Sequence, residues 1–191
     1  MLCLKCDTNP EWIENVKKNI DITIADHAHC EKKAAFTGMN LLNKYPDKTE
    51  LAFAMSDLVE EEIGHFRAVM KILNGRGIVL SPDNGDEYAR TLFTQLRKNQ
   101  PLRFMDHLLV AGIIEARSCE RLKILEENVE DEKLSKFYKT LAASEAGHYM
   151  TFKKLAEIYF EKQEVKSRLD ELAKIEAAFV KSLPNNPAMH G

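Results

Sequence analysis

The sequence predicts an all-α protein: a four-helix bundle with one long crossover connection and an added C-terminal helix. Three observations favour this class. Apolar residues recur at spacings of three and four over long segments, which is the period of an amphipathic helix. Few helix-breaking residues interrupt the 191 residues, which contain 8 Gly and 6 Pro. The breakers and turn formers divide the chain into four long segments and three shorter ones.

The first half of the chain is expected to contain one short helix and two long ones. The short helix lies near residues 10–18, and the first long helix covers about 21–45. That helix ends before Pro46, because proline disfavours a helical conformation in the residue preceding it. The second long helix covers about 48–74 and ends at Gly75, since glycine is the commonest residue just past a helix C-terminus.

The second half begins with a cluster of turn formers at residues 81–85. A shorter helix follows at 86–99. Proline favours the first position of a helix, so the third long helix is expected to start at residue 101 and to extend to about 128. The fourth long helix covers 131–161, and the added terminal helix covers 165–182.

The connections define the topology of the bundle. Short loops join the first long helix to the second and the third to the fourth, whereas the long stretch 76–100 joins the second to the third. One such crossover is typical of ferritin-like bundles. We expect residues 1–191 to form a single ferritin-like domain, with 1–9 as a flexible N-terminus and 184–191 as a C-terminal tail.

Six residues that can bind metal occur in a repeated order. Each half of the chain has a glutamate followed about thirty residues later by a Glu-x-x-His pair: Glu31 with Glu62 and His65, then Glu115 with Glu145 and His148. The two sets are offset by about 84 residues, so the sequence predicts a duplicated helical hairpin. Residues three apart share a helix face, and each pair can therefore direct a carboxylate and an imidazole at one point.

All six residues interrupt apolar stripes, so they are predicted to face the interior. Burying four carboxylates without compensation would cost several kcal/mol each, and two divalent cations would cancel their charge. This ligand order is that of di-iron and di-manganese carboxylate bundles. Oxygen-rich ligands with one histidine per metal suit iron or manganese, and the pattern does not decide between them. His27 is expected to support the site or the core, and His29 to lie at a helix surface.

Composition argues against several other classes. The formal net charge of -3 gives no polycationic signal for a nucleic-acid partner. Apolar runs are too short to cross a membrane, and the first residues lack a signal-peptide core, so we expect a cytoplasmic protein without a membrane partner. The Cys3-x-x-Cys6 spacing lacks a second pair that would complete a zinc site.

Four segments around the predicted ligands, residues 26–31, 61–66, 114–121 and 144–149, resemble those of a known family. The most distinctive is the run Glu-Ala-Arg-Ser-Cys-Glu-Arg at 115–121. On these motifs the chain resembles the bacterial tRNA 2-methylthio-isopentenyladenosine hydroxylase family, often called MiaE, over about residues 12–179.

The resemblance implies a non-haem di-iron monooxygenase that hydroxylates the isopentenyl group of 2-methylthio-N6-isopentenyladenosine in the tRNA anticodon loop. Two iron ions would activate O2, with electrons from an external donor such as a ferredoxin or reductase. Carried over by position, Glu31 and His65 would bind one iron, Glu115 and His148 the other, and Glu62 and Glu145 would bridge them. The protein would act as a monomer or small homo-oligomer.

Similar di-iron bundles imply two further contacts. The residue before each Glu-x-x-His glutamate bonds the histidine of the opposite pair there. Here that pattern indicates Glu61 for His148 and Ser144 for His65.

The tRNA contacts are predicted from basic residues in two places, the crossover stretch and the distinctive motif. The candidates are Arg90, Arg97, Lys98, Arg103, Arg117 and Arg121. The bias of the crossover stretch is mild, and a plain solvated face explains it equally well.

Two other functions share the same ligands. One is a ferritin-like di-iron or di-manganese oxidase or peroxidase of small molecules. The other is an iron-storage protein, which would assemble into a hollow shell. The motif at 115–121 favours the hydroxylase, since iron binding alone does not need it.

Overall fold

The computed structural model describes residues 2–83 and 85–191, and every regular element in these ranges is an α-helix. The all-α class predicted from the sequence is confirmed. The helices are α1 Pro10–Lys18, α2 Ile20–Lys44, α3 Thr49–Gly75, α4 Glu87–Phe93, α5 Leu102–Asn128, α6 Glu132–Tyr159 and α7 Lys162–Val180. Among the described residues, none of these helices is long and apolar enough to span a membrane.

The predicted boundaries agree with the structure to within a few residues, except in α4. This helix was expected to reach residue 99 but ends at Phe93. The backbone N–H of Arg97 donates instead to the Asp106 carboxylate of α5 at 2.8 Å, and the Arg97 guanidinium bonds the same carboxylate. A tertiary contact thus replaces the intrahelical hydrogen bond, and the sequence gives no local sign of this exchange.

The chain forms two compact units. The α5–α6 unit contains the chain up to Lys17, Asp86–Asn186 and His190–Gly191. The α2–α3 unit contains Lys18–Gly85 and Pro187–Met189.

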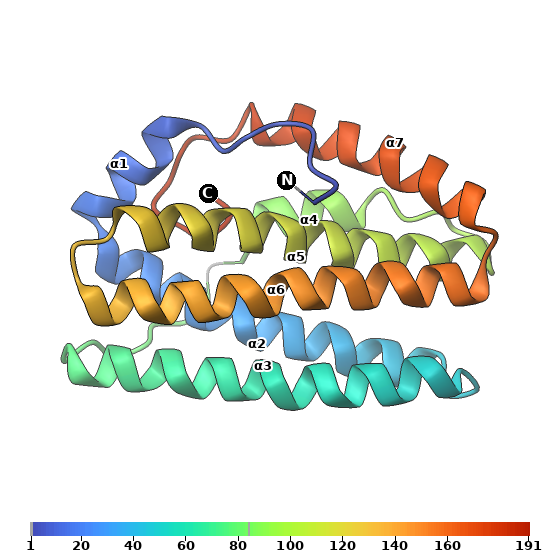
Figure 1. Ribbon diagram of the computed structural model, residues 1–191, viewed down its shortest axis with the longest axis horizontal. Coiled ribbons are helices and arrows are strands. Elements are labelled where there is room, and N and C mark those ends of the chain that lie inside the picture. The colour runs from blue at the N-terminus through green and yellow to red at the C-terminus, as the bar shows by residue number, and fades with distance from the viewer. Residues whose placement is uncertain (1, 84) are drawn as a thin grey trace. The chain divides into compact units, whose positions relative to one another are not determined.

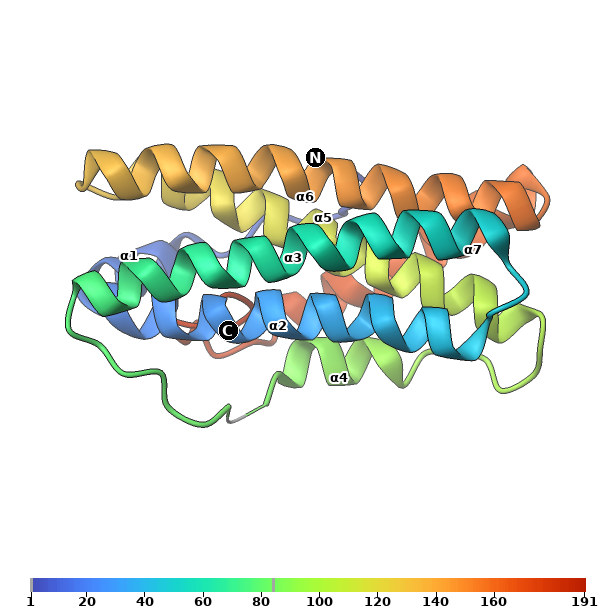
Figure 2. The ribbon, with the colours of Figure 1, turned by 90° about the horizontal axis from the view of Figure 1, so that it is seen from below.

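In the α2–α3 unit, two long helices run antiparallel and are joined by a short loop (Figure 2). Gly38 lets them approach closely, because a Cβ there would lie 2.7 Å from Val59 Cγ2. The start of the crossover folds back onto α2, where Lys33 pairs with Asp83 at 3.1 Å. The buried stripes contain Ile24, Ala28, Glu31, Ala35, Gly38 and Leu41 in α2, and Leu51, Met55, Leu58, Glu62, Val69 and Leu73 in α3.

In the α5–α6 unit, α5 and α6 form a second antiparallel pair, and α7 packs against α5 (Figure 1). Helix α5 is buried over much of its length, and the buried residues include the charged Asp106, Glu115, Arg117 and Arg121. Arg117 and Glu176, both 0% exposed, form a bidentate pair at 2.8 and 3.1 Å. The Arg121 guanidinium lies 4.7 Å from the ring centroid of Trp12.

The N-terminal segment, which was expected to be flexible, packs onto α5. Leu4 is buried against Ala116 and Tyr149. The backbone N–H and the hydroxyl of Thr8 both donate to the Glu120 carboxylate, at 2.7 and 2.6 Å. These contacts attach the segment to α5.

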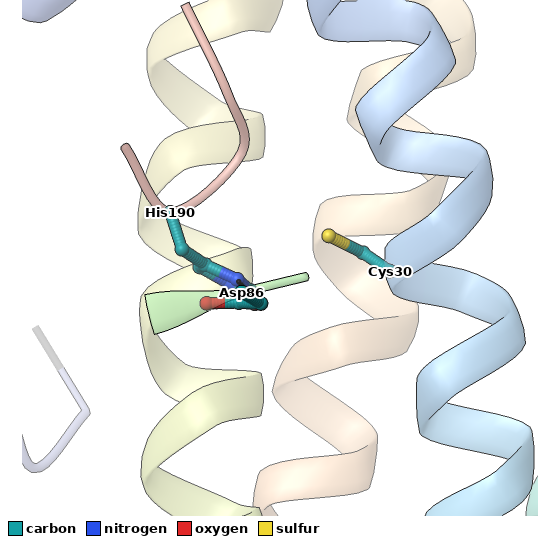
Figure 3. A group of neighbouring side chains, drawn as sticks. All are labelled: Cys30, Asp86 and His190. Carbon is teal, nitrogen blue, oxygen red and sulfur yellow. Dashed lines mark hydrogen bonds and ion pairs between the residues drawn. The ribbon is translucent and has the colours of Figure 1, made fainter. Parts of the chain in front are cut away.

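The C-terminal residues are also packed. In the α5–α6 unit, His190 Nδ1 lies 3.0 Å from the Asp86 carboxylate, and the two side chains point toward each other in Figure 3. His190 Nε2 lies 3.1 Å from Ser118 Oγ, and its ring stacks on Tyr88. In the α2–α3 unit, the backbone N–H of Met189 donates to an Asp26 side chain whose oxygen lies 2.7 Å away.

Candidate metal centre

The α2–α3 unit contains the first predicted set of ligands, here called the first triad: Glu31, Glu62 and His65. Glu31 comes from α2, and the other two come from successive turns of α3. His65 Nδ1 lies 3.3 Å from Glu31 Oε2 and 3.4 Å from Glu62 Oε2. Both glutamates are buried, Glu62 completely. The predicted convergence of these three side chains is therefore present within the unit.

The electrostatics of the first triad favour a cation. Burial alone would lower the pKa of His65, but the Glu31 and Glu62 carboxylates outweigh that effect and raise it to about 10. In the metal-free protein a proton on His65 thus partly neutralises the two carboxylates at neutral pH. A divalent metal ion would replace this proton and add a further positive charge.

The α5–α6 unit contains the second triad: Glu115, Glu145 and His148. All three side chains are buried. One ligand atom from each lies within 4.8 Å of the others, and His148 Nδ1 is 3.6 Å from Glu145 Oε2. Glu145 Oε2 is buried and accepts no hydrogen bond from the part of the chain that the structure describes.

These groups fit a metal ion. A buried carboxylate oxygen without a hydrogen bond is costly, and a cation is one of the few partners that compensate it. Each triad offers two carboxylates and one imidazole, the ligand set that suits iron or manganese. Each set could hold a metal ion.

Two histidines near the first triad differ in their contacts. His27 is 2% exposed, and its Nε2 lies 2.5 Å from Glu31 Oε1. This agrees with the expectation that it supports the site or the core. His29, expected at a helix surface, is buried, with Nε2 3.0 Å from the Ser81 carbonyl oxygen. That prediction was wrong because the crossover folds over this part of α2.

The two predicted supporting residues are less buried than the glutamates of the triads. Glu61 has a side chain that is 50% exposed, and its carboxylate lies 3.7 Å from Nε2 of His65 on its own helix. Ser144 is partly buried on α6. The pairings of Glu61 with His148 and of Ser144 with His65 stay predictions.

The basic residues predicted to contact tRNA divide into two groups. Arg117 and Arg121 are fully buried, with Arg117 paired to Glu176 and Glu120, so the expectation that they reach tRNA needs correction. The guanidinium of Arg97 donates hydrogen bonds to the Asp106 carboxylate. Contacts with segments distant in sequence bury these arginines or bind their guanidinium groups. The residues next to them in the sequence do not indicate those contacts. Arg90 and Lys98 are exposed and Arg103 is partly buried, so these three keep the predicted role.

One contact near the second triad was not predicted. Burial raises the pKa of the Cys3 thiol to about 11, although a hydrogen bond with Tyr149 favours the thiolate. Burial also raises the pKa of the Tyr149 phenol above its usual range. Both residues line a surface pocket of about 430 Å³ between the N-terminal segment and α7. In the sequence, the Cys-x-x-Cys spacing at Cys3 and Cys6 was the signal that drew attention to the N-terminal side of this pocket.

Comparisons with known proteins agree with this geometry. A curated tRNA 2-(methylsulfanyl)-N(6)-isopentenyladenosine(37) hydroxylase from Pseudomonas putida is 38% identical over 162 residues, or 85% of this chain and 78% of the relative. A protein of the same description from Salmonella typhimurium is 28% identical, covering 94% of this chain and 84% of the relative.

A solved structure also matches. It is described as protein 43 with aldehyde deformylating oxygenase activity from Synechococcus. Its TM-score is 0.94 at 34% identity, over 100% of this chain and 96% of the other. This likeness confirms the ferritin-like fold class.

The family comparison extends over the whole chain. The family model described as tRNA-(MS[2]IO[6]A)-hydroxylase (MiaE) matches residues 1–191. The distinctive run at 115–121 lies inside this match, on the helix that carries Glu115. The chain therefore belongs to the MiaE family of tRNA hydroxylases.

Proposed function

We propose that this protein is a monooxygenase that hydroxylates the isopentenyl group of 2-methylthio-N6-isopentenyladenosine in tRNA. The observation that carries the proposal is the family match over residues 1–191 together with a curated relative of that activity at 38% identity. The two buried triads supply the chemical means, because a non-haem iron centre can carry out the O2 chemistry that hydroxylation of an allylic methyl group requires.

The six residues of the two triads are proposed to hold two iron ions. Glu31 and His65 would bind one ion and Glu115 and His148 the other, with Glu62 and Glu145 bridging. Three observations support this assignment. The two triads contain the same residue types, their glutamates are buried, and the buried Glu145 Oε2 accepts no hydrogen bond from the described residues. When bound, the iron pair supplies the activation of O2, and an external ferredoxin or reductase supplies electrons.

The chain's own residues then have three tasks. The carboxylates and imidazoles are held on rigid helices, so the reacting centre is oriented before substrate arrives. The burial of the four glutamates limits the access of water to the centre. Arg90, Lys98 and Arg103 are proposed to contact tRNA phosphates while the modified base leaves the anticodon stack. A tRNA substrate also implies a cytoplasmic location.

Analysis of tRNA nucleosides tests the proposal. A strain that makes the precursor nucleoside but lacks this gene should accumulate it, and complementation should restore the hydroxylated form. Mass spectrometry of digested tRNA measures both species. Unchanged nucleosides in the deletion and complemented strains would contradict the proposed function.

Metal analysis tests the centre separately. We expect Glu62→Ala and Glu145→Ala to lose bound iron, since each removes a bridging carboxylate. Glu60→Ala is the matched control, because Glu60 lies on the exposed side of α3. Full iron content in both ligand variants would refute the bridging assignment.

The solved relative suggests a second reaction to examine, since its description names an activity on aldehydes. Incubation of the iron-loaded protein with a long-chain aldehyde and a reductant should give no deformylated product. Aldehyde turnover without tRNA turnover would favour a small-molecule oxygenase. The native mass of the protein tests iron storage. A monomer or small homo-oligomer of 21.8 kDa chains has a much lower mass than a hollow shell built from many such chains.

A further inference from the structure

His27 occupies a position that the duplicated ligand pattern does not explain. It lies one helical turn before Glu31 on α2 and is 2% exposed. Its Nε2 is 2.5 Å from Glu31 Oε1. The other carboxylate oxygen, Oε2, lies 3.3 Å from His65 Nδ1 on α3. The Glu31 carboxylate is therefore held between two imidazoles, with a different oxygen toward each.

We propose that His27 positions Glu31 for metal binding through the contact of its Nε2 with Oε1, which leaves Oε2 for the metal ion. This inference rests on the proposed metal centre. A carboxylate fixed at one oxygen can rotate less, so less entropy is lost when its other oxygen binds a cation. His27 is thus a positioning residue that acts through Glu31.

The second triad lacks this arrangement. The offset of about 84 residues that relates Glu31 to Glu115 places Ala111 at the position equivalent to His27. Ala111 is buried and has no polar atom in its side chain. The two metal positions are consequently unequal, although their ligands are of the same types.

The neighbouring His29 provides a natural comparison. It is also buried on α2, but its Nε2 bonds the Ser81 carbonyl oxygen and its Nδ1 lies 3.0 Å from Lys32 Nζ. Its removal should disturb the crossover contact and not the metal ligands. His29→Ala is therefore the matched control for loss of a buried histidine on this helix.

The test is a titration of the metal-free full-length protein with Mn²⁺, followed by the electron paramagnetic resonance signal of the free ion. The wild-type protein should bind two ions. We expect His27→Ala to weaken one of the two sites about 10–100-fold, the usual effect of losing a group that orients a ligand. His29→Ala should leave both sites unchanged.

Two amide variants separate positioning from other roles. His27→Gln keeps an N–H donor of similar reach and should restore binding to within a few-fold, whereas the shorter His27→Asn should not. The same pair carries the test if His27→Ala fails to fold. Equal affinity in the wild type and the Ala and Asn variants, an equal loss at both sites, or no rescue by Gln would overturn the proposal. Absence of Mn²⁺ binding in the wild type would instead refute the metal centre.

Discussion

Burial determines what the individual side chains of this protein can do. Glu62 is completely buried, so its charge must be compensated by His65 in the metal-free state and by a cation in the proposed metal-bound state. The same principle applies to uncharged groups. Cys3 packs against Tyr149, where burial disfavours its thiolate form.

Cys3 should therefore react slowly with iodoacetamide, which attacks thiolates. A pKa of about 11, against an ordinary value of 9.0, reduces the thiolate fraction at pH 8 about 100-fold. The stabilising contribution of the neutral thiol is present below pH 9 and is lost as the pH rises toward 11. Peptide mass spectrometry should show a rate that increases up to about pH 11 in the native protein and levels off near pH 9 in urea. Levelling near pH 9 in both states would contradict this prediction.

At the scale of the elements, α5 is the helix on which the α5–α6 unit is built. It carries a buried ion pair to α7 and contacts the N-terminal segment through Glu120. It also receives Arg97 and Arg168 at Asp106, each through charge-assisted hydrogen bonds. These contacts join parts of the chain that are far apart in sequence.

The ion pair of Arg117 and Glu176 should be costly to break. Glu176→Gln removes the fully buried partner of the Arg117 guanidinium and leaves only Glu120 as its charge partner, and breaking a buried pair in this way typically destabilises by about 3–5 kcal/mol. Urea denaturation measures the change in the free energy of unfolding. The double variant Arg117→Met with Glu176→Leu should recover much of the loss, because it removes both charges together. A single variant as stable as wild type would show that Glu120 alone compensates the Arg117 guanidinium.

The close approach of α2 and α3 should also be sensitive to a single methyl group. Gly38→Ala places a Cβ 2.7 Å from Val59 Cγ2 and should destabilise by about 1–3 kcal/mol. Gly64→Ala is the control on α3, since among the described residues its added Cβ would contact nothing within 4 Å apart from its own helix backbone, and it should stabilise slightly through helix propensity. Thermal denaturation compares the two. Equal effects would mean that helix propensity, and not packing, dominates at position 38.

The helices and the convergence of the side chains within each triad could be predicted, because both follow from the spacing of residues along the helices. The helical period alone places Glu62 and His65 on one face. The end of α4 and the burial of His29 and Arg117 could not be predicted, because distant segments cause them: Asp106 for α4, the crossover for His29 and α7 for Arg117. Periodicity reports which face of a helix is buried, but not which distant segment covers a polar residue.

At the scale of the whole molecule, the proposed centre would draw ligands from both compact units. A metal ion that binds the folded protein and not the unfolded chain stabilises it by about 2.7 kcal/mol at 100 times its dissociation constant. If the ions are shared between units, that stabilisation extends to both units at once.

Hydrogen exchange measures this coupling. Adding iron or Mn²⁺ to the metal-free protein should slow exchange in α2 and α3 as well as in α5 and α6. Glu145→Ala, although it lies in the α5–α6 unit, should abolish the protection of α2 and α3 too. Glu60→Ala should preserve it. Protection confined to the unit that retains its triad would contradict a shared centre.

The presence of both ligand sets in one chain has an evolutionary consequence. In a homodimer of identical hairpins, every mutation occurs twice, so its two metal positions cannot be altered independently. A tandem duplication removes that constraint, and the contrast between His27 and Ala111 is a difference of the kind that it permits. The presence of both hairpins in a single polypeptide thus allows each half, with its triad, to be selected separately from the other.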